Sequence, residues 1–169
     1  LLRLKKPIEG LGEAPLLHTG DGEAGKTLTF VGYGSRGIGS TGEQPRFYTG
    51  SDKAAAHGVV DELVDPAKPT RKKGDLGNWM GVFLPKEDGS IENPYGGARK
   101  PVDRLVGLLG SGDSGGSAWM TVDGHWRIVG VNSNGSGTAR YGDSSWFARV
   151  SPHRDWIASH VPTARFSAP

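Results

Sequence analysis

The most chemically suggestive part of the sequence is a glycine-rich run, residues 110–118, with Ser114 at its centre. A serine hydroxyl is a weak nucleophile, so it reacts only when a general base lies beside it. The oxyanion that forms on the attacked carbonyl needs N–H donors aimed at it. Glycines on both sides of a serine let the backbone turn its N–H groups toward that oxygen and let substrate approach closely. The run therefore predicts acyl transfer with Ser114 as the nucleophile.

Three other short patterns compete with this interpretation, and the elements around them decide against each. Residues 20–27 match a phosphate-binding P-loop, and residues 32–37 match a dinucleotide-binding fingerprint. Both motifs must open a helix, but a strand pattern follows the first and a polar, Gly-rich segment follows the second. Residues 112–116 also match the nucleophile elbow, which needs a strand–turn–helix. A β-hairpin pattern follows Ser114 instead.

The elements that must position Ser114 are predicted to be short β-strands. Residues 27–31 alternate polar and apolar, as in a half-buried strand. Asp123-Gly124 joins two apolar runs and predicts a two-residue hairpin turn. Ser151-Pro152 predicts the start of a helix over about 152–160. Strands are predicted at residues 1–4, 27–31, 59–64, 79–84, 118–122, 126–131 and 145–150.

The composition narrows the fold class and excludes several functions. The 169 residues include 28 Gly and 11 Pro, which suits short strands with tight turns rather than a helical bundle. A net charge of +2 gives no electrostatic case for nucleic acid or a membrane surface as partner. No apolar run approaches the roughly 18 residues of a membrane span. The absence of Cys excludes disulfides and thiolate metal sites. We expect one all-β domain, an antiparallel barrel with a short C-terminal helix, and neither a metal nor a cofactor.

Residues 112–116 form a Gly-Asp-Ser-Gly-Gly motif, and with it the chain resembles the chymotrypsin/trypsin-like serine peptidases, in a bacterial form. Residues 29–34 end in Gly-aromatic-Gly, residues 128–135 are similar to the family's substrate-pairing strand, and residues 146–157 are similar to the family's ending. The resemblance implies that residues 1–169 are the second barrel of a double-barrel serine endopeptidase, with an enlarged loop region at about 35–100. It also implies secretion or a periplasmic location.

The resemblance assigns the parts of the reaction to individual residues. Ser114 would attack the scissile carbonyl, and the N–H groups of Gly112 and Ser114 would form the oxyanion hole. Ser133, Asn134 and Gly135 would lie along the bound peptide. The substrate would be a peptide or protein, with no nucleic acid, membrane, metal or cofactor involved.

The resemblance also predicts the primary specificity pocket and the role of Asp113. Leu108 would form the base of the pocket, Gly135 would leave one wall open, and Ser145 would narrow the other wall. An apolar base favours a small or medium apolar side chain before the scissile bond, because a cation there would be buried unpaired. Asp113 would be a structural carboxylate that pairs with an α-amino group of the first barrel or with a basic side chain.

The resemblance implies that the histidine and aspartate of the triad lie outside this chain. Residues 1–4 resemble the stretch that follows the family's catalytic aspartate, so both residues are expected on a separate or cleaved N-terminal half, the predicted partner. His57 stands in an Ala-Ala-His sequence like the family's histidine motif, but a polar segment precedes it where the family has an apolar strand. We therefore do not assign His57 as the base.

Two other functions remain open at this point. A chain without a base and an aspartate could be a non-catalytic, protease-like subunit that binds a partner or peptide, although the intact Gly-Asp-Ser-Gly-Gly motif argues against this. The glycines could also serve only as turn residues of a β-domain, but this would leave the ordered series of family-like segments unexplained.

Overall fold

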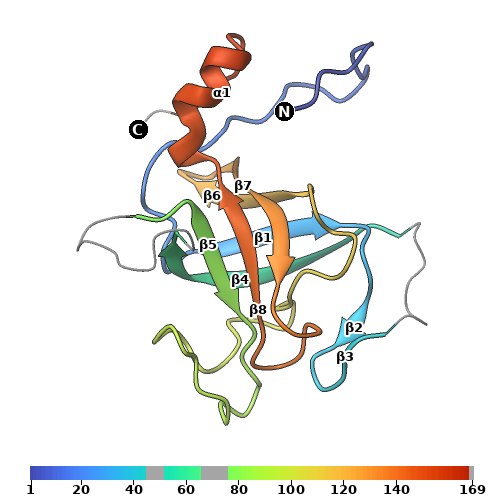
Figure 1. Cartoon of the computed structure of the whole chain (residues 1–169), viewed down its shortest axis with the longest axis vertical. Helices are drawn as coiled ribbons and strands as arrows, with labels where there is room; N and C mark the ends of the chain where they lie inside the picture. Colours follow the sequence, from blue (N-terminus) through green and yellow to red (C-terminus); the bar gives the residue numbers. More distant parts are fainter. Residues whose placement is uncertain (45–51, 66–75, 168–169) are drawn as a thin grey trace.

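The chain folds as a closed antiparallel β-barrel followed by a short helix, in a computed structural model that describes residues 1–44, 52–65 and 76–167 (Figure 1). The barrel order is β1-β4-β5-β8-β7-β6, and two short strands, β2 and β3, pair separately. The bounds are β1 Thr27–Gly32, β2 Gly37–Ile38, β3 Gly42–Glu43, β4 Ala54–Val64, β5 Trp79–Phe83, β6 Ser117–Val122, β7 His125–Gly135, β8 Ser144–Arg149 and α1 Arg154–His160. The predicted all-β barrel with a C-terminal helix is confirmed.

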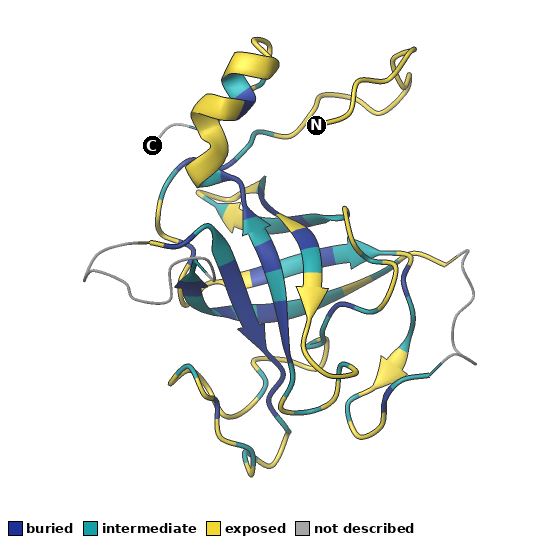
Figure 2. Cartoon of the chain, in the orientation of Figure 1, coloured by how far each residue is buried: buried dark blue, intermediate teal, exposed yellow. Residues whose placement is uncertain are grey.

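Alternate side chains of the strands fill the barrel, and the buried residues concentrate in its strands (Figure 2). In β1, Leu28 and Phe30 are buried while Thr27 is exposed, as the polar–apolar alternation predicts. The ring of Phe30 lies 5.1 Å from that of Phe147, measured between centroids. Gly58 of β4 has no room for a side chain, because a Cβ would collide with Val82. The other core residues include Val60, Leu63, Met80, Leu109, Ala118, Met120 and Val129.

The hairpin of β6 and β7 forms as predicted, but two strands extend beyond their apolar runs. Asp123 and Gly124 have φ values of 50° and 74°, the conformation that a two-residue hairpin turn requires. β7 continues to Gly135 because it keeps pairing with β8. β4 begins at Ala54 rather than at residue 59, because it pairs with β1 along the whole of β1. Within the region 35–100, β4 and β5 are therefore barrel strands, and residues 45–51 and 66–75 lie outside the described residues.

The prediction of a strand at residues 1–4 is wrong. Leu1, Leu2 and Leu4 are 67%, 96% and 58% exposed, and no strand lies beside them in the described part of the chain. Without a neighbouring strand the backbone N–H and C=O groups have no ladder to join, so an apolar pattern alone does not make a strand. The chain joins the barrel backbone at Leu16, whose carbonyl oxygen accepts a hydrogen bond from Ile128 N, and at Leu17, which bridges to residues 128 and 166.

The C-terminal helix is short and packs through one residue. A single 3-10 turn, Ser151–His153, carries Pro152 near its start and leads into α1, in agreement with the predicted helix over about 152–160. Ile157 of α1 is buried, whereas Trp156 is half exposed. Over the residues described, no helix is both long enough and apolar enough to cross a membrane.

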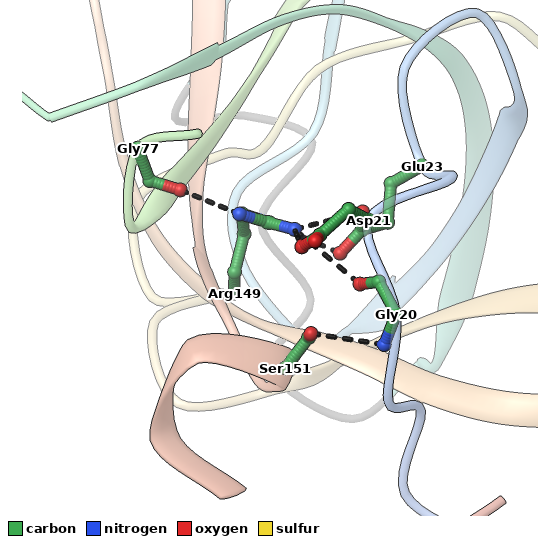
Figure 3. A network of polar contacts seen from close by, with 6 residues as sticks. All are labelled: Gly20, Asp21, Glu23, Gly77, Arg149 and Ser151. Carbon is green, nitrogen blue, oxygen red and sulfur yellow. Dashed lines mark hydrogen bonds and ion pairs between the residues drawn. The ribbon is translucent and has the colours of Figure 1, made fainter. Parts of the chain in front are cut away.

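A buried arginine joins three separate segments of the chain (Figure 3). Arg149, at the end of β8, is 1% exposed. Its guanidinium donates hydrogen bonds to both carboxylate oxygens of Glu23 at 3.0 and 2.9 Å, to Asp21 at 3.0 Å and to the carbonyl of Gly77 at 2.7 Å. Because Glu23 is fully buried as well, each charge depends on the other for compensation.

His18 is buried beside this network. Neither ring nitrogen has a hydrogen-bond partner among the described residues. Burial lowers the pKa of the imidazole, and the nearby negative charge of Glu23 offsets part of this effect. The fold therefore accommodates the neutral ring and disfavours the protonated one.

Replacing Glu23 by Ala should lower the free energy of unfolding by about 3–5 kcal/mol, because Arg149 then remains buried without its main counter-charge. Urea denaturation at pH 7 measures the change. Glu13→Ala is the control, since Glu13 pairs with Arg165 on the surface with its side chain 85% exposed and should change stability by less than about 0.5 kcal/mol. Equal effects of the two substitutions would contradict the importance of the buried pair.

Stability should also fall in mild acid because of His18. The pKa of His18 is lower in the folded chain than its value of about 6.5 in the unfolded chain. The unfolded chain therefore takes up the proton first, and stability is lost as the pH falls below about 6.5. Urea denaturation from pH 8 to pH 5 should show a shallower decline for His18→Leu than for the wild type. If the free energy of unfolding fell with pH in parallel for the two proteins, His18 would not be the cause of the loss of stability.

Candidate functional site

Ser114 lies in a tight turn between the loop that ends at residue 113 and strand β6. Two of the neighbouring glycines, Gly112 and Gly115, have φ values of +95° and +85°, which L-residues with side chains adopt only with strain. The Ser114 side chain is exposed, and its Oγ donates a hydrogen bond to the carbonyl oxygen of Ser133 at 2.9 Å. The turn therefore presents a serine hydroxyl to the surface, against the end of β7.

The backbone of this turn leaves two N–H groups unpaired. Asp113 N donates to Gly110 O, Gly115 N to Asn132 O, and Gly116 N to Asp113 O, at 3.1, 2.9 and 3.1 Å. The N–H groups of Gly112 and Ser114 have no partner among the described residues. These are the two donors that the sequence assigned to the oxyanion hole, and they remain available to an external acceptor.

The carboxylate of Asp113 points away from Ser114 into the backbone. Its two oxygens accept hydrogen bonds from Gly34 N at 2.7 Å and from Gly110 N at 2.8 Å. A Cβ at Gly32 or Gly34 would collide with this carboxylate, so both glycines are needed for the close approach. The sequence predicted an amino group or a basic side chain as the partner of Asp113, whereas peptide N–H groups bind it in the structure.

The end of β7 is irregular where it passes Ser114. The pairing of β7 with β8 shifts between Asn132 and Asn134, which leaves Ser133 at a bulge. Bulges turn a strand locally and are common beside active sites. On the other side, pairing with β6 reaches only Val131, and Asn132 is then bound to the turn itself. Residues 133–135 therefore have a paired strand on one side only.

Asn132 joins the turn to two strands. It is 2% exposed, and its Nδ2 donates to the carbonyl oxygens of Val31 and Asp113, both at 3.2 Å. A buried amide that bonds two carbonyls fixes the distance between them. Asn132 is a positioning residue that the sequence did not reveal, because its role depends on pairing between distant segments.

A pocket of about 230 Å³ adjoins Ser114 and brings together four of the predicted site residues. Ser114, Ser133, Asn134 and Gly135 all line it. Its remaining walls come from Glu43, Leu109, Gly110, Ser111, Ser136, Gly137 and Ala139.

Two residues predicted for the specificity pocket do not line this cavity. Leu108 packs against the barrel core and lines a separate cavity of about 330 Å³ on which Asp113 also borders. Ser145 is 1% exposed, and its Oγ accepts a hydrogen bond from Leu109 N at 2.9 Å. Ser145 therefore holds the loop before Ser114 through this hydrogen bond.

Glu43 is the residue of this pocket that sequence reasoning missed. It lies in β3, 68 positions before Ser111, and its Oε1 accepts hydrogen bonds from Ser111 N and Ser111 Oγ at 2.9 and 3.2 Å. No local pattern in the polar, Gly-rich stretch around it distinguishes Glu43 from a loop glutamate. Only the folding of β2 and β3 against the turn brings it to the pocket.

The loop that precedes the site is held by a half-buried carboxylate of β4. Asp61 accepts hydrogen bonds from Phe83 N at 2.8 Å and from Asn93 Nδ2 at 2.9 Å. Burial raises the pKa of Asp61, and these two hydrogen bonds oppose the rise. Asn93 also donates to Ala98 O at 3.2 Å, so Asp61 anchors the chain that leads toward Ser114.

His57 has a carboxylate partner, but it is not joined to Ser114. Its Nδ1 lies 3.0 Å from Asp103 Oδ2, and its backbone pairs with residues 105–107. His57 does not line the pocket beside Ser114. In the described part of the chain, no histidine or carboxylate is bonded to the Ser114 hydroxyl.

An exposed hydroxyl, two free N–H groups and an adjoining pocket are three of the parts that acyl transfer needs. The fourth part, a general base, is not bonded to Ser114 by any described residue. No group of three metal-ligating side chains occurs in the described ranges. The two N–H groups can donate hydrogen bonds to a carbonyl next to Ser114, and the exposed hydroxyl is accessible to a base from outside the turn.

Replacing Gly34 by Ala should disturb the Ser114 turn, because the added Cβ would meet the carboxyl and backbone nitrogen of Asp113 at 2.7 Å. We expect a loss of about 1–3 kcal/mol in the free energy of unfolding and shifted NMR amide signals at Gly112 and Ser114. Gly22→Ala is the matched control, since its Cβ would meet no atom within 4 Å. Unchanged amide signals in Gly34→Ala would show that Asp113 does not set the geometry of the turn.

Comparison with known proteins does not add a family to these observations. A scan against protein-family models and a search of curated proteins both return no match. The geometry around Ser114, together with the sequence motif that contains it, is therefore what a functional assignment must use.

Proposed function

We propose that this chain supplies the nucleophile, the oxyanion hole and the primary pocket of a serine endopeptidase. The observation that carries the proposal is the exposed Ser114 hydroxyl beside the unpaired N–H groups of Gly112 and Ser114, at the edge of a pocket. The Gly-Asp-Ser-Gly-Gly motif and its resemblance to chymotrypsin/trypsin-like peptidases support the same reaction. A secreted or periplasmic location belongs to this proposal.

In the proposed reaction, Ser114 Oγ attacks the carbonyl carbon of a peptide bond while a histidine takes its proton. The carbonyl oxygen becomes an oxyanion and accepts hydrogen bonds from Gly112 N and Ser114 N. The C–N bond then breaks, the histidine protonates the leaving amine, and an ester remains on Ser114. Water, deprotonated by the same histidine, hydrolyses the ester and restores the serine.

The histidine and the aspartate that orients it are proposed to come from an N-terminal half outside these 169 residues. The Ser114 hydroxyl is bonded to a carbonyl and is open to the surface, so it can accept a base from another segment. Leu1, Leu2 and Leu4 extend from the barrel with most of their apolar surface exposed (Figure 2). An exposed apolar segment of this kind suits contact with a second barrel.

A non-catalytic binding subunit is the second candidate. The observation in its favour is that no base among the described residues contacts Ser114. Such a subunit could still bind a peptide along residues 133–135, where β7 has a free edge. The two candidates differ in whether Ser114 becomes reactive when the proposed N-terminal half is present.

A fluorophosphonate probe tests the reactivity of Ser114. In the complex with the N-terminal half, Ser114 should be labelled at least about 100-fold faster than in the chain alone, because general-base catalysis contributes factors of this size. Ser114→Ala should abolish labelling, while Ser159→Ala, a substitution in α1, should not. Absence of labelling in the complex would favour the binding subunit. Equally fast labelling of the isolated chain would place the base within this chain, with His57 as the first residue to replace.

A further inference from the structure

The pocket beside Ser114 is polar, and it contains a single charged side chain. Its walls include the hydroxyl-bearing residues Ser111, Ser133 and Ser136, and Leu109 is its largest apolar residue. Glu43 is the only ionisable side chain among its described lining residues. A half-buried carboxylate in a cavity of about 230 Å³ gives the cavity negative character.

The carboxylate of Glu43 is fixed in place through one of its oxygens. Oε1 accepts two hydrogen bonds from Ser111, one from its N–H and one from its hydroxyl. The second oxygen, Oε2, has no partner among the described residues. One oxygen therefore positions the side chain, and the other remains able to accept a hydrogen bond from a ligand.

The backbone around Glu43 is anchored by two hydrogen bonds to neighbouring segments. Glu43 N donates to Thr138 O at 2.7 Å, and Gln44 N donates to Arg36 O at 2.8 Å. Gly42 has a φ of +79°, and a Cβ there would collide with Thr138. The β2–β3 pair thus holds Glu43 against the loop that follows β7, and rigid placement of this kind is what a selective site requires.

No described cation forms an ion pair with Glu43, although Arg36 and Arg104 line a second cavity on which Glu43 also borders. The ion pairs of the described residues involve other carboxylates, and none includes Glu43. Arg140 passes close to Gly42, but no ion pair joins it to Glu43. A carboxylate with a free oxygen and no counter-ion favours a cationic ligand, because burying that cation completes a charge-assisted hydrogen bond.

We propose that Glu43 is a specificity-determining residue and that the pocket accepts the lysine or arginine side chain that precedes the scissile bond. This inference rests on the proposed peptidase function. The position expected to set specificity, Leu108, does not line the pocket beside Ser114. In its place, a carboxylate from β3 reaches the pocket from the side of Ser111.

A purely structural role for Glu43 makes a different prediction. If Glu43 only anchors Ser111, a glutamine should replace it without changing substrate preference, because the amide oxygen can accept the same two hydrogen bonds. If Glu43 binds the substrate cation, the loss of its charge should lower kcat/KM selectively for cationic substrates. Glu43→Gln therefore separates the two roles, since it keeps the shape and the acceptor while it removes the charge.

The test uses the complete enzyme and four peptide substrates that differ only in the residue before the scissile bond: Arg, Lys, citrulline and norleucine. We expect kcat/KM to be roughly 10- to 100-fold higher for Arg and Lys than for their uncharged counterparts, as expected for a hydrogen bond to a charged group. Glu43→Gln should remove most of this difference and should leave kcat/KM for the citrulline and norleucine substrates nearly unchanged. Glu92→Gln is the control, because Glu92 is exposed and pairs with Arg99 on the surface.

A binding measurement keeps the inference testable without catalysis. In the complete protein with Ser114→Ala, n-butylguanidinium should shift the NMR amide signals of Ser111 and Gly135, and Glu43→Gln should weaken this binding at least tenfold. Two outcomes would overturn the role of Glu43, provided that Ser114 still reacts with a neutral fluorophosphonate. The first is a preference of the wild-type enzyme for small apolar residues before the scissile bond. The second is an unchanged preference for Arg and Lys in a folded Glu43→Gln enzyme. Failure of that labelling in the wild-type complete enzyme would instead overturn the proposed peptidase function.

Discussion

The geometry of the candidate site depends on one carboxylate bound by peptide N–H groups. Asp113 links the segment after β1, through Gly34, to the loop at Gly110, and its own backbone carries Ser114. Hydrogen bonds from N–H groups to an ionised carboxylate are short and strong. Because these partners are backbone atoms, the constraint requires glycine at Gly32 and Gly34 and no particular side chain. Ser114 is thereby placed against β7 by a residue that takes no direct part in the proposed reaction.

Stability and chemistry are concentrated in different parts of this barrel. The apolar core and the buried pair of Arg149 and Glu23 hold the strands and the incoming chain together. The Ser114 turn, by contrast, is exposed and is built from glycines and unpaired N–H groups. Unpaired donors cost stability unless a ligand or water satisfies them, so their position beside an exposed hydroxyl is consistent with binding a developing anion.

Local features of the site could be predicted from the sequence, and features that depend on distant segments could not. Ser114 and the hairpin at Asp123-Gly124 follow from short motifs, because adjacent residues determine a tight turn. Leu108, expected at the pocket beside Ser114, lines another cavity, and Glu43, which the sequence did not single out, lines that pocket, because the packing of β2 and β3 brings it there. Residues 1–4 show the same limit: an apolar pattern predicts a strand, but a strand also needs a neighbour.

The closed barrel has a consequence for how the molecule can associate. In the described part of the chain every barrel strand pairs with a neighbour on both sides over at least part of its length, so no strand leaves a whole side open to another copy. One stretch that is paired on one side only is 133–135, where pairing with β6 has ended and pairing with β8 continues. An extended backbone that joins the barrel at this stretch lies beside Ser114, over a length of only a few residues. Beside Ser114 the architecture thus has room for one short strand and not for a sheet of several residues' width along β7.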